Sequence, residues 1–282
     1  MTVKITFPNP PHVAPELPVY ATVNPAWDVE RVTDLGMRLD VRGPVIDAGA
    51  WFVIRDGAST LEVCKASHSV RLGRDASAGA AVGTSNAVLD RARAVSVAER
   101  FHNLLGDTAA HAEIQSVTEL TVTTASRGRQ AFERQLAGLQ VSHRFRLDGL
   151  PLVGAGAKAQ VTVGRDGELV QGCRFWRDVT RRGTRPAVPP QQAFERFAAT
   201  QPCGELPSSA QVVVTRVHLA LLCLPPTEVQ GVLLPVYALR GAVRSERLPS
   251  DEFVAYVTAV ATNDGDAARK PWSVARPSSL VA

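Results

Sequence analysis

The stretch Val141–Val179, VSHRFRLDGLPLVGAGAKAQVTVGRDGELVQGCRFWRDV, decides the expected fold of this chain. Apolar residues from Val141 to Leu147 fall on one face at a period of two, as in a strand with one buried side. Asp-Gly pairs at 148–149 and 166–167 follow such runs, and Asp-Gly supplies the positive φ values that tight hairpins need. The stretch predicts three consecutive antiparallel strands, with residues 158–177 forming two neighbours around a tight turn at Asp166-Gly167.

Outward from this stretch, a helix followed by strands recurs three times along the sequence. Apolar spacing predicts helices at 27–39, 88–105 and 191–200. The pattern indicates an α+β fold of two or three units, each with a helix packed on a curved antiparallel sheet. The expected organisation is an extended proline-rich arm (1–18), an N-terminal helix-hairpin unit (19–80), a central unit (88–180), a C-terminal unit (187–262) and a tail (263–282).

The composition is that of a folded domain, with 45% hydrophobic and 21% charged residues in a chain of 282. Its net charge of +4 is mild and does not indicate a nucleic-acid partner. No apolar run approaches the length of about 20 residues that spans a membrane. Prolines at 8, 10, 11, 15 and 18 interrupt any apolar export leader. These features predict a cytoplasmic protein.

Motifs that bind metals or cofactors are not found in the sequence. The cysteines (Cys64, Cys173, Cys203 and Cys223) have spacings that suit neither zinc nor a disulfide framework, so we expect reduced, unligated thiols. No nucleophile elbow, phosphate-binding loop or dinucleotide fingerprint occurs, so no cofactor is expected. Among the histidines, His102 on a helix is the candidate general base, whereas His143 and His218 fit core or edge positions of strands.

The most site-like cluster is a run of arginines around an aromatic residue. Within twelve residues lie Arg174, Trp176, Arg177, Arg181, Arg182 and Arg185. An aromatic ring flanked by guanidinium groups can stack on, and pair with, an acidic peptide or an anionic ligand. The alternative is a solvated strand end and linker, with Trp176 closing a sheet against a helix.

A second candidate comes from the sequence LPVYA, which occurs at 17–21 and again at 234–238. The echo places Tyr20 and Tyr237 at equivalent strand positions, where they would line a binding cleft. Core packing is the alternative for both tyrosines.

Residues 144–171, RFRLDGLPLVGAGAKAQVTVGRDGELVQ, resemble the PepSY-type and related propeptide domains of thermolysin-like metalloproteases. The positions that match that pattern are Gly149, Pro151, Val153, Gly154, Asp166 and Gly167. The order of helix and strands, with the closing Phe175-Trp176-Arg177, is also similar to bacterial tandem-domain regulators of the YycH/YycI type. The resemblance implies cystatin/PepSY-like units with a binding or inhibitory role. The printed sequence contains neither the His-Glu-x-x-His motif of the proteases nor an apolar run that could form the membrane anchor expected of the regulators.

Two classes of function remain open from the sequence. The first is a non-catalytic binding or regulatory protein that recognises a peptide or protein partner, by adding a strand to a sheet edge or through its arginines. The second is a cofactor-free enzyme, a cyclase or isomerase of a specialised pathway, that uses an apolar pocket between helix and sheet to hold a small apolar or anionic ligand. The missing nucleophile, metal and nucleotide motifs favour the first class.

Overall fold

The computed structural model describes residues 4–74, 90–106, 111–125, 132–199, 211–245, 248–261 and 273–274. These residues contain the helices α1 (Val29–Arg38), α2 (Arg91–Leu104) and α3 (Pro190–Ala199). The strands, in chain order, are β1 (Lys4–Thr6), β2 (Glu16–Thr22), β3 (Val45–Ala48), β4 (Trp51–Asp56), β5 (Ser59–Cys64), β6 (Val70–Arg74), β7 (Ala112–Ala125), β8 (Phe132–Leu147), β9 (Leu150–Val153), β10 (Lys158–Gly164), β11 (Leu169–Phe175), β12 (Val179–Pro186), β13 (Gln211–Leu222), β14 (Val232–Leu233), β15 (Pro235–Ser245), β16 (Leu248–Thr258) and β17 (Ser273–Val274).

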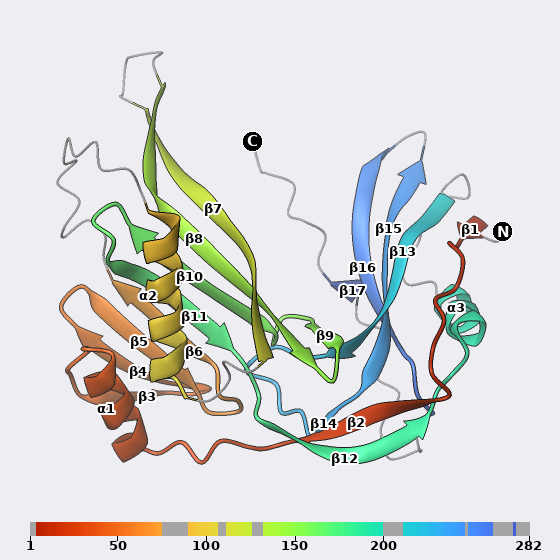
Figure 1. Cartoon of the computed structure of the whole chain (residues 1–282), viewed down its shortest axis with the longest axis horizontal. Coiled ribbons are helices and arrows are strands. Elements are labelled where there is room, and N and C mark those ends of the chain that lie inside the picture. Colours follow the sequence, from red (N-terminus) through yellow and green to blue (C-terminus); the bar gives the residue numbers. More distant parts are fainter. Residues whose placement is uncertain are drawn as a thin grey trace.

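Most of these strands belong to a single mixed sheet of 14 strands (Figure 1). Its order is β17-β16-β15-β13-β9-β8-β10-β11-β6-β5-β4-β3, with β1 pairing beside β13 and β7 beside β8. A second sheet contains β12, β2 and β14. The expected α+β tandem of cystatin/PepSY-like units, each with its own helix-covered sheet, is therefore wrong, and the described part of the protein is mainly β.

Pairing between strands that are distant in the sequence explains this correction. Strand β11 pairs with β6, which joins the expected N-terminal and central units, and β9 pairs in parallel with β13, which joins the central and C-terminal units. Strand β2, which spans the end of the expected arm and the start of the expected N-terminal unit, pairs with β12 of the arginine-rich segment in the second sheet. Periodicity reports which face of a strand is buried but not which strand lies beside it, so the sequence left these units separate.

The helices lie close to the predicted positions because local signals define them. Helix α1 begins after Asp28, whose side chain accepts a hydrogen bond from the Arg31 N–H, and α2 begins after Asp90 in the same manner. Helix α2 packs on the sheet through Phe101, whose ring lies so close to Gly172 of β11 that a Cβ there would come within 2.6 Å of it. No helix in the described ranges is long and apolar enough to cross a membrane.

The Asp-Gly turns are hairpins, as predicted. Val163 of β10 pairs directly with Leu169 of β11, so the Asp166-Gly167 turn joins antiparallel neighbours. Only Gly167 has a positive φ there (81°), whereas both Asp148 (47°) and Gly149 (79°) do at the β8–β9 turn. The second geometry is that of a type I′ turn. The same dipeptide therefore forms two different tight turns in this chain.

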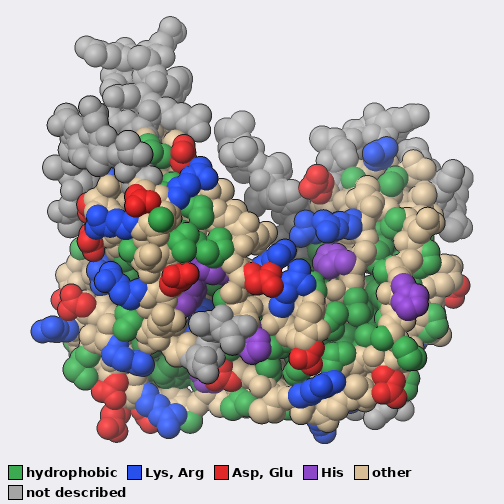
Figure 2. Space-filling view, in the orientation of Figure 1, with side chains coloured by type: hydrophobic (Ala, Val, Ile, Leu, Met, Phe, Trp, Pro, Cys, Tyr) green, Lys and Arg blue, Asp and Glu red, His purple; other side chains and the backbone are tan. Residues whose placement is uncertain are grey.

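The large sheet bends into two lobes that diverge from β9 (Figure 1). We call the part with α1, α2, β3–β8, β10 and β11 the N-terminal lobe, and the part with α3, β1, β13 and β15–β17 the C-terminal lobe. Each lobe has its own apolar core beneath its helices. The region between β7 on one side and β13 and β16 on the other is called the notch, and the described surfaces of the two lobes diverge around it (Figures 1 and 2).

Candidate functional site

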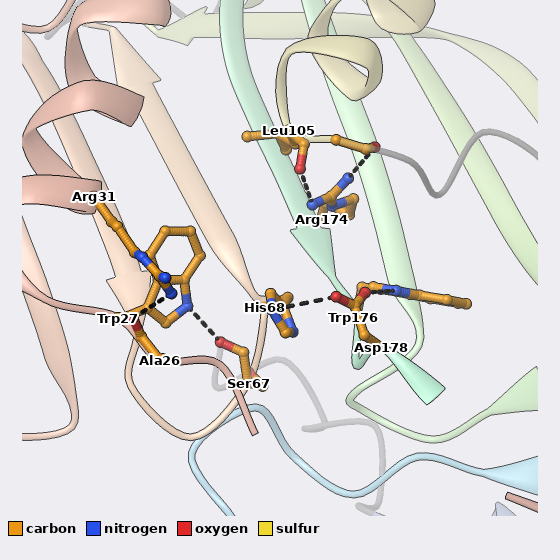
Figure 3. A network of polar contacts seen from close by, with 10 residues as sticks. Ala26, Trp27, Arg31, Ser67, His68, Leu105, Arg174, Trp176 and Asp178 are labelled. Carbon is orange, nitrogen blue, oxygen red and sulfur yellow. Dashed lines mark hydrogen bonds and ion pairs between the residues drawn. The ribbon is translucent and has the colours of Figure 1, made fainter. Parts of the chain in front are cut away.

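Arg174, the first residue of the predicted patch, is an interior residue. It is 3% exposed, and its guanidinium group donates to the carbonyl oxygens of Leu105 (2.6 Å) and Gly106 (3.2 Å) at the end of α2 (Figure 3). Burial lowers the Arg174 pKa to about 10, so the group remains charged at neutral pH. A cation bonded to the last carbonyl oxygens of a helix stabilises its C-terminus. Arg174 therefore has a structural role, which is to bind the C-terminal end of α2.

Arg177 is also buried, at 3% exposure. Its guanidinium donates to the carbonyl oxygens of Leu224 (2.8 Å), Pro225 (2.7 Å) and Glu228 (2.7 Å). Burial lowers the Arg177 pKa, with the nearby acidic and thiol groups opposing that shift. The side chain therefore fixes the loop that follows β13 and offers no surface to a partner.

Trp176 is 3% exposed and packs at the junction of the two sheets, so it is a core residue as the packing alternative holds, but it packs against strands and not against a helix. Its indole N–H donates to the Asp178 carboxylate (2.8 Å), whose other oxygen lies 3.3 Å from Nε2 of His68 (Figure 3). Burial lowers the His68 pKa despite this carboxylate. The buried Ser67 and Ser69 hydroxyls bond to each other, so neither is placed as a nucleophile activated by the imidazole.

Arg181 and Arg182 are the exposed members of the predicted patch, on the edge strand β12. Arg181 pairs loosely with Asp148, 3.8 Å away. The edge carries a register shift between Arg181 and Gly183 and ends at Pro186. Charges, bulges and prolines are the devices that keep an edge from pairing with another strand. This edge is therefore poorly suited to strand addition.

The two tyrosines of the LPVYA echo do not share a cleft. Tyr20, on β2, donates to the Asp148 carboxylate (2.6 Å), and Tyr237, on β15, donates to the Val188 carbonyl oxygen (2.7 Å). They are 4% and 0% exposed, and they belong to different apolar clusters. The core-packing alternative is correct for both.

A surface pocket of about 270 Å³ lies at the start of α1. Its lining combines Trp27, His68, Arg31, Arg38, Asp34 and the backbone region of Pro25 and Ala26. The indole of Trp27 is fixed by a hydrogen bond to the Ser67 carbonyl oxygen (3.1 Å), and Arg31 is fixed by the Ala26 carbonyl oxygen (2.8 Å) (Figure 3). Its mixed polar lining differs from the apolar cavity that the enzyme alternative requires.

His102 packs edge-on against His143, with ring centroids 4.6 Å apart. Within the described part of the chain, neither nitrogen of His102 has a hydrogen-bond partner. Burial, together with the nearby His143 and Arg174, lowers the His102 pKa to about 3. The imidazole is therefore neutral and enclosed, which does not fit a general base that exchanges protons with a substrate.

Strand β7 forms one side of the notch and has a free edge, because it pairs only with β8 in the described sheet. It has 14 residues, whereas the other outer strands β3, β1 and β17 have 4, 3 and 2. Its sequence, AEIQSVTELTVTTA, contains no proline, lysine or arginine, and Ile114 and Val122 are 45% and 52% exposed. Register shifts flank an evenly paired run from Ser116 to Leu120. A long edge of this kind is a ready template for another strand.

The other side of the notch is the face of β13, β15 and β16 that points away from α3. Arg216 of β13 lies directly opposite Arg240 of β15, and both are exposed. His218, two residues along β13, has its pKa lowered by burial and by these two guanidinium groups. Basic and histidine side chains gather on this side of the C-terminal lobe in the space-filling view (Figure 2). Sequence reasoning missed both arginines, since their proximity depends on strand register.

Other chemical groups add no site. Cys64, Cys173 and Cys223 are free, and Cys203 lies outside the described residues. The part of the chain that the structure describes contains no group of three or more His, Cys, Asp or Glu side chains placed to hold a metal ion.

Comparisons with known proteins give a fold but no activity. No family model matches the chain, and no curated protein matches it. Among solved structures, an uncharacterized protein from Eubacterium rectale is similar, with a TM-score of 0.54 and 8% identity over 92% of this chain and 88% of that one. At this identity the likeness shows the fold alone, over nearly the whole chain. Kinship with PepSY-type or YycH/YycI proteins stays a prediction.

Proposed function

We propose that this protein is a non-catalytic binding protein that takes an extended segment of a protein partner as an added strand on β7. The single observation that carries the proposal is the 14-residue free edge of β7. Strand addition uses main-chain hydrogen bonds for affinity and neighbouring side chains for specificity. Strand β12 is a less suitable edge, because it has 8 residues with three arginines and a terminal proline, whereas β7 has 14 residues with no proline and an evenly paired run from Ser116 to Leu120.

The compartment we propose is the cytoplasm. The free thiols of Cys64, Cys173 and Cys223 support a reducing compartment, where such thiols persist.

Two neighbouring proline substitutions test the proposal. Thr118 and Glu119 are exposed and lie in the evenly paired run of β7. Adjacent N–H groups of a strand point to opposite edges, so one of T118P and E119P removes a bond to β8 and the other removes only a free donor. The variant that keeps the stability of the parent protein identifies the outer donor. The other variant is its matched control for a structural defect.

Peptides selected from a random displayed library serve as probes. We expect them to slow amide hydrogen exchange along β7 and to lose affinity for the outer-donor proline variant. Peptides that bind without protecting β7 would contradict the proposal. So would outer β7 amides that are already protected in the unliganded protein, or a dimer that the outer-donor variant dissociates, because the edge would then belong to the chain itself or to a second copy.

A further inference from the structure

We infer that the segment bound in the notch is acidic, and that Arg216 and Arg240 recognise it; this rests on the proposed strand addition at β7. The two arginines come from adjacent strands and form a directly opposed pair. Like charges placed directly opposite each other in a sheet destabilise it. A binding partner that brings carboxylates to this pair relieves that repulsion.

No acidic side chain in the described ranges forms an ion pair with either guanidinium group. The other strand neighbour of Arg240 is Val254, and Glu252 lies one row farther along β16, opposite Ala242. Arg144 and Arg146 give the contrast within this molecule. Both bond to Glu113, at 2.9 and 3.1 Å. The sheet therefore supplies a carboxylate to Arg144 and Arg146, whereas Arg216 and Arg240 are left for a ligand to pair with.

Strand register shows that this pair faces the notch. Side chains alternate along β13, so Arg216, His218 and Ala220 share one face. Ala220 packs with Tyr256 and with Val153 of β9, the strand from which the two lobes diverge. Val217 and Leu219, on the opposite face, pack with the core beneath α3. The arginine-bearing face therefore points away from α3, and β7 lies on that side of the C-terminal lobe (Figure 1).

The charges around the notch favour an anionic partner. Arg244 lies on the same face as Arg240, four residues along β15, and is exposed. Glu252 opposes them on this wall. On β7, Glu119 pairs opposite Leu139, whose side chain is buried under α2, so Glu119 lies on the helix-bearing face of the strand. Acidic residues on an incoming strand would meet a net positive wall and accelerate its association.

Three synthetic peptides of one β-prone sequence test the inference, with Glu, Gln or Lys at alternate positions. We expect the Glu peptide to bind about tenfold more tightly than the Gln peptide at low salt, and the difference to shrink at high salt. The double variant R216E/R240E should prefer the Lys peptide. The matched control R91E/R100E makes the same charge change on the exposed side of α2 and should keep the preference for Glu.

The outcomes separate the two proposals. Equal binding of the Glu and Gln peptides, with β7 still protected, overturns the acidic partner and leaves strand addition standing. Binding of all three peptides without β7 protection overturns strand addition itself, and the acidic inference with it. Displacement of the Glu peptide by inorganic phosphate, beyond that by chloride at equal ionic strength, would make the pair a general anion site and overturn a protein partner.

Discussion

The arginines of the segment 174–185 and the pair formed by Arg216 and Arg240 differ in a way that sequence proximity does not reveal. The first group is dense in the sequence, yet the fold buries Arg174 and Arg177 and leaves Arg181 and Arg182 on a blunted edge. The second pair is far apart in the sequence, yet strand pairing places the two side by side and exposed. A local run of charge therefore says less about a binding surface than the register of two strands.

The largest expected effect is on stability, at Arg177. R177A should lower the free energy of unfolding by about 3 kcal/mol, because three carbonyl oxygens, one in a buried and two in partly buried hydrogen bonds, lose a charged donor. Urea unfolding measures the loss. R177K keeps the charge but not the planar guanidinium group. Its free energy of unfolding should lie between those of the parent protein and R177A. An R177A protein as stable as the parent would show that the loop after β13 does not depend on this residue.

Acid should destabilise the N-terminal lobe, where His102 lies beside Arg174 and His143. The His102 pKa is lowered from 6.5 to about 3, so the unfolded chain binds its proton first as the pH falls. The contribution of His102 to the free energy of unfolding is fully present above pH 6.5 and is lost between pH 6.5 and about pH 3, at up to about 1.4 kcal/mol per pH unit.

Urea unfolding at a series of pH values measures this dependence. H102L, which cannot be protonated, should have a shallower slope between pH 6.5 and 3 than the parent protein. Equal slopes would show that the interior accepts charge at this position.

A smaller effect on stability is expected at Arg216, where one substitution should affect folding and peptide binding in opposite directions. R216E converts the like-charged pair with Arg240 into an opposed pair of unlike charge. It should raise the free energy of unfolding by about 0.5 kcal/mol while abolishing the preference for the Glu peptide. A less stable R216E protein, or one that still prefers the Glu peptide, would contradict the role assigned to this pair.

The smallest effect is expected on β12. R181Q/R182Q should change the free energy of unfolding by less than about 0.5 kcal/mol and leave peptide affinity unchanged, because the exposed pair with Asp148 contributes little. Thermal unfolding and the peptide titration check both. A marked loss of affinity would return the binding surface to the segment 174–185.

Local elements of this fold could be predicted from the sequence, and the connections between them could not. The helices follow from apolar spacing and from caps such as Asp28, and the Asp166-Gly167 hairpin follows from a dipeptide that favours tight turns. The parallel pairing of β9 with β13 joins strands on either side of α3. No local preference specifies such a contact, so the sequence indicated separate units where the chain forms a continuous sheet.

The candidate site illustrates the same limit. Arg174 was expected at a surface because its sequence neighbours are charged, but the carbonyl oxygens that it binds belong to Leu105 and Gly106, which follow α2 and are far away in the sequence. The free edge of β7 could be recognised only once β8 was known as its one partner in the described sheet. Edges and opposed pairs are properties of the assembled sheet.

Amide hydrogen exchange along β7, measured with and without saturating Glu peptide, is the decisive measurement for strand addition in the notch. We expect slower exchange at alternate amides of the run from Ser116 to Leu120 in the parent protein and in R91E/R100E, whereas R216E/R240E should need a higher concentration of the Glu peptide to show the same slowing. Unchanged exchange along β7 in the parent protein saturated with peptide would contradict strand addition in the notch.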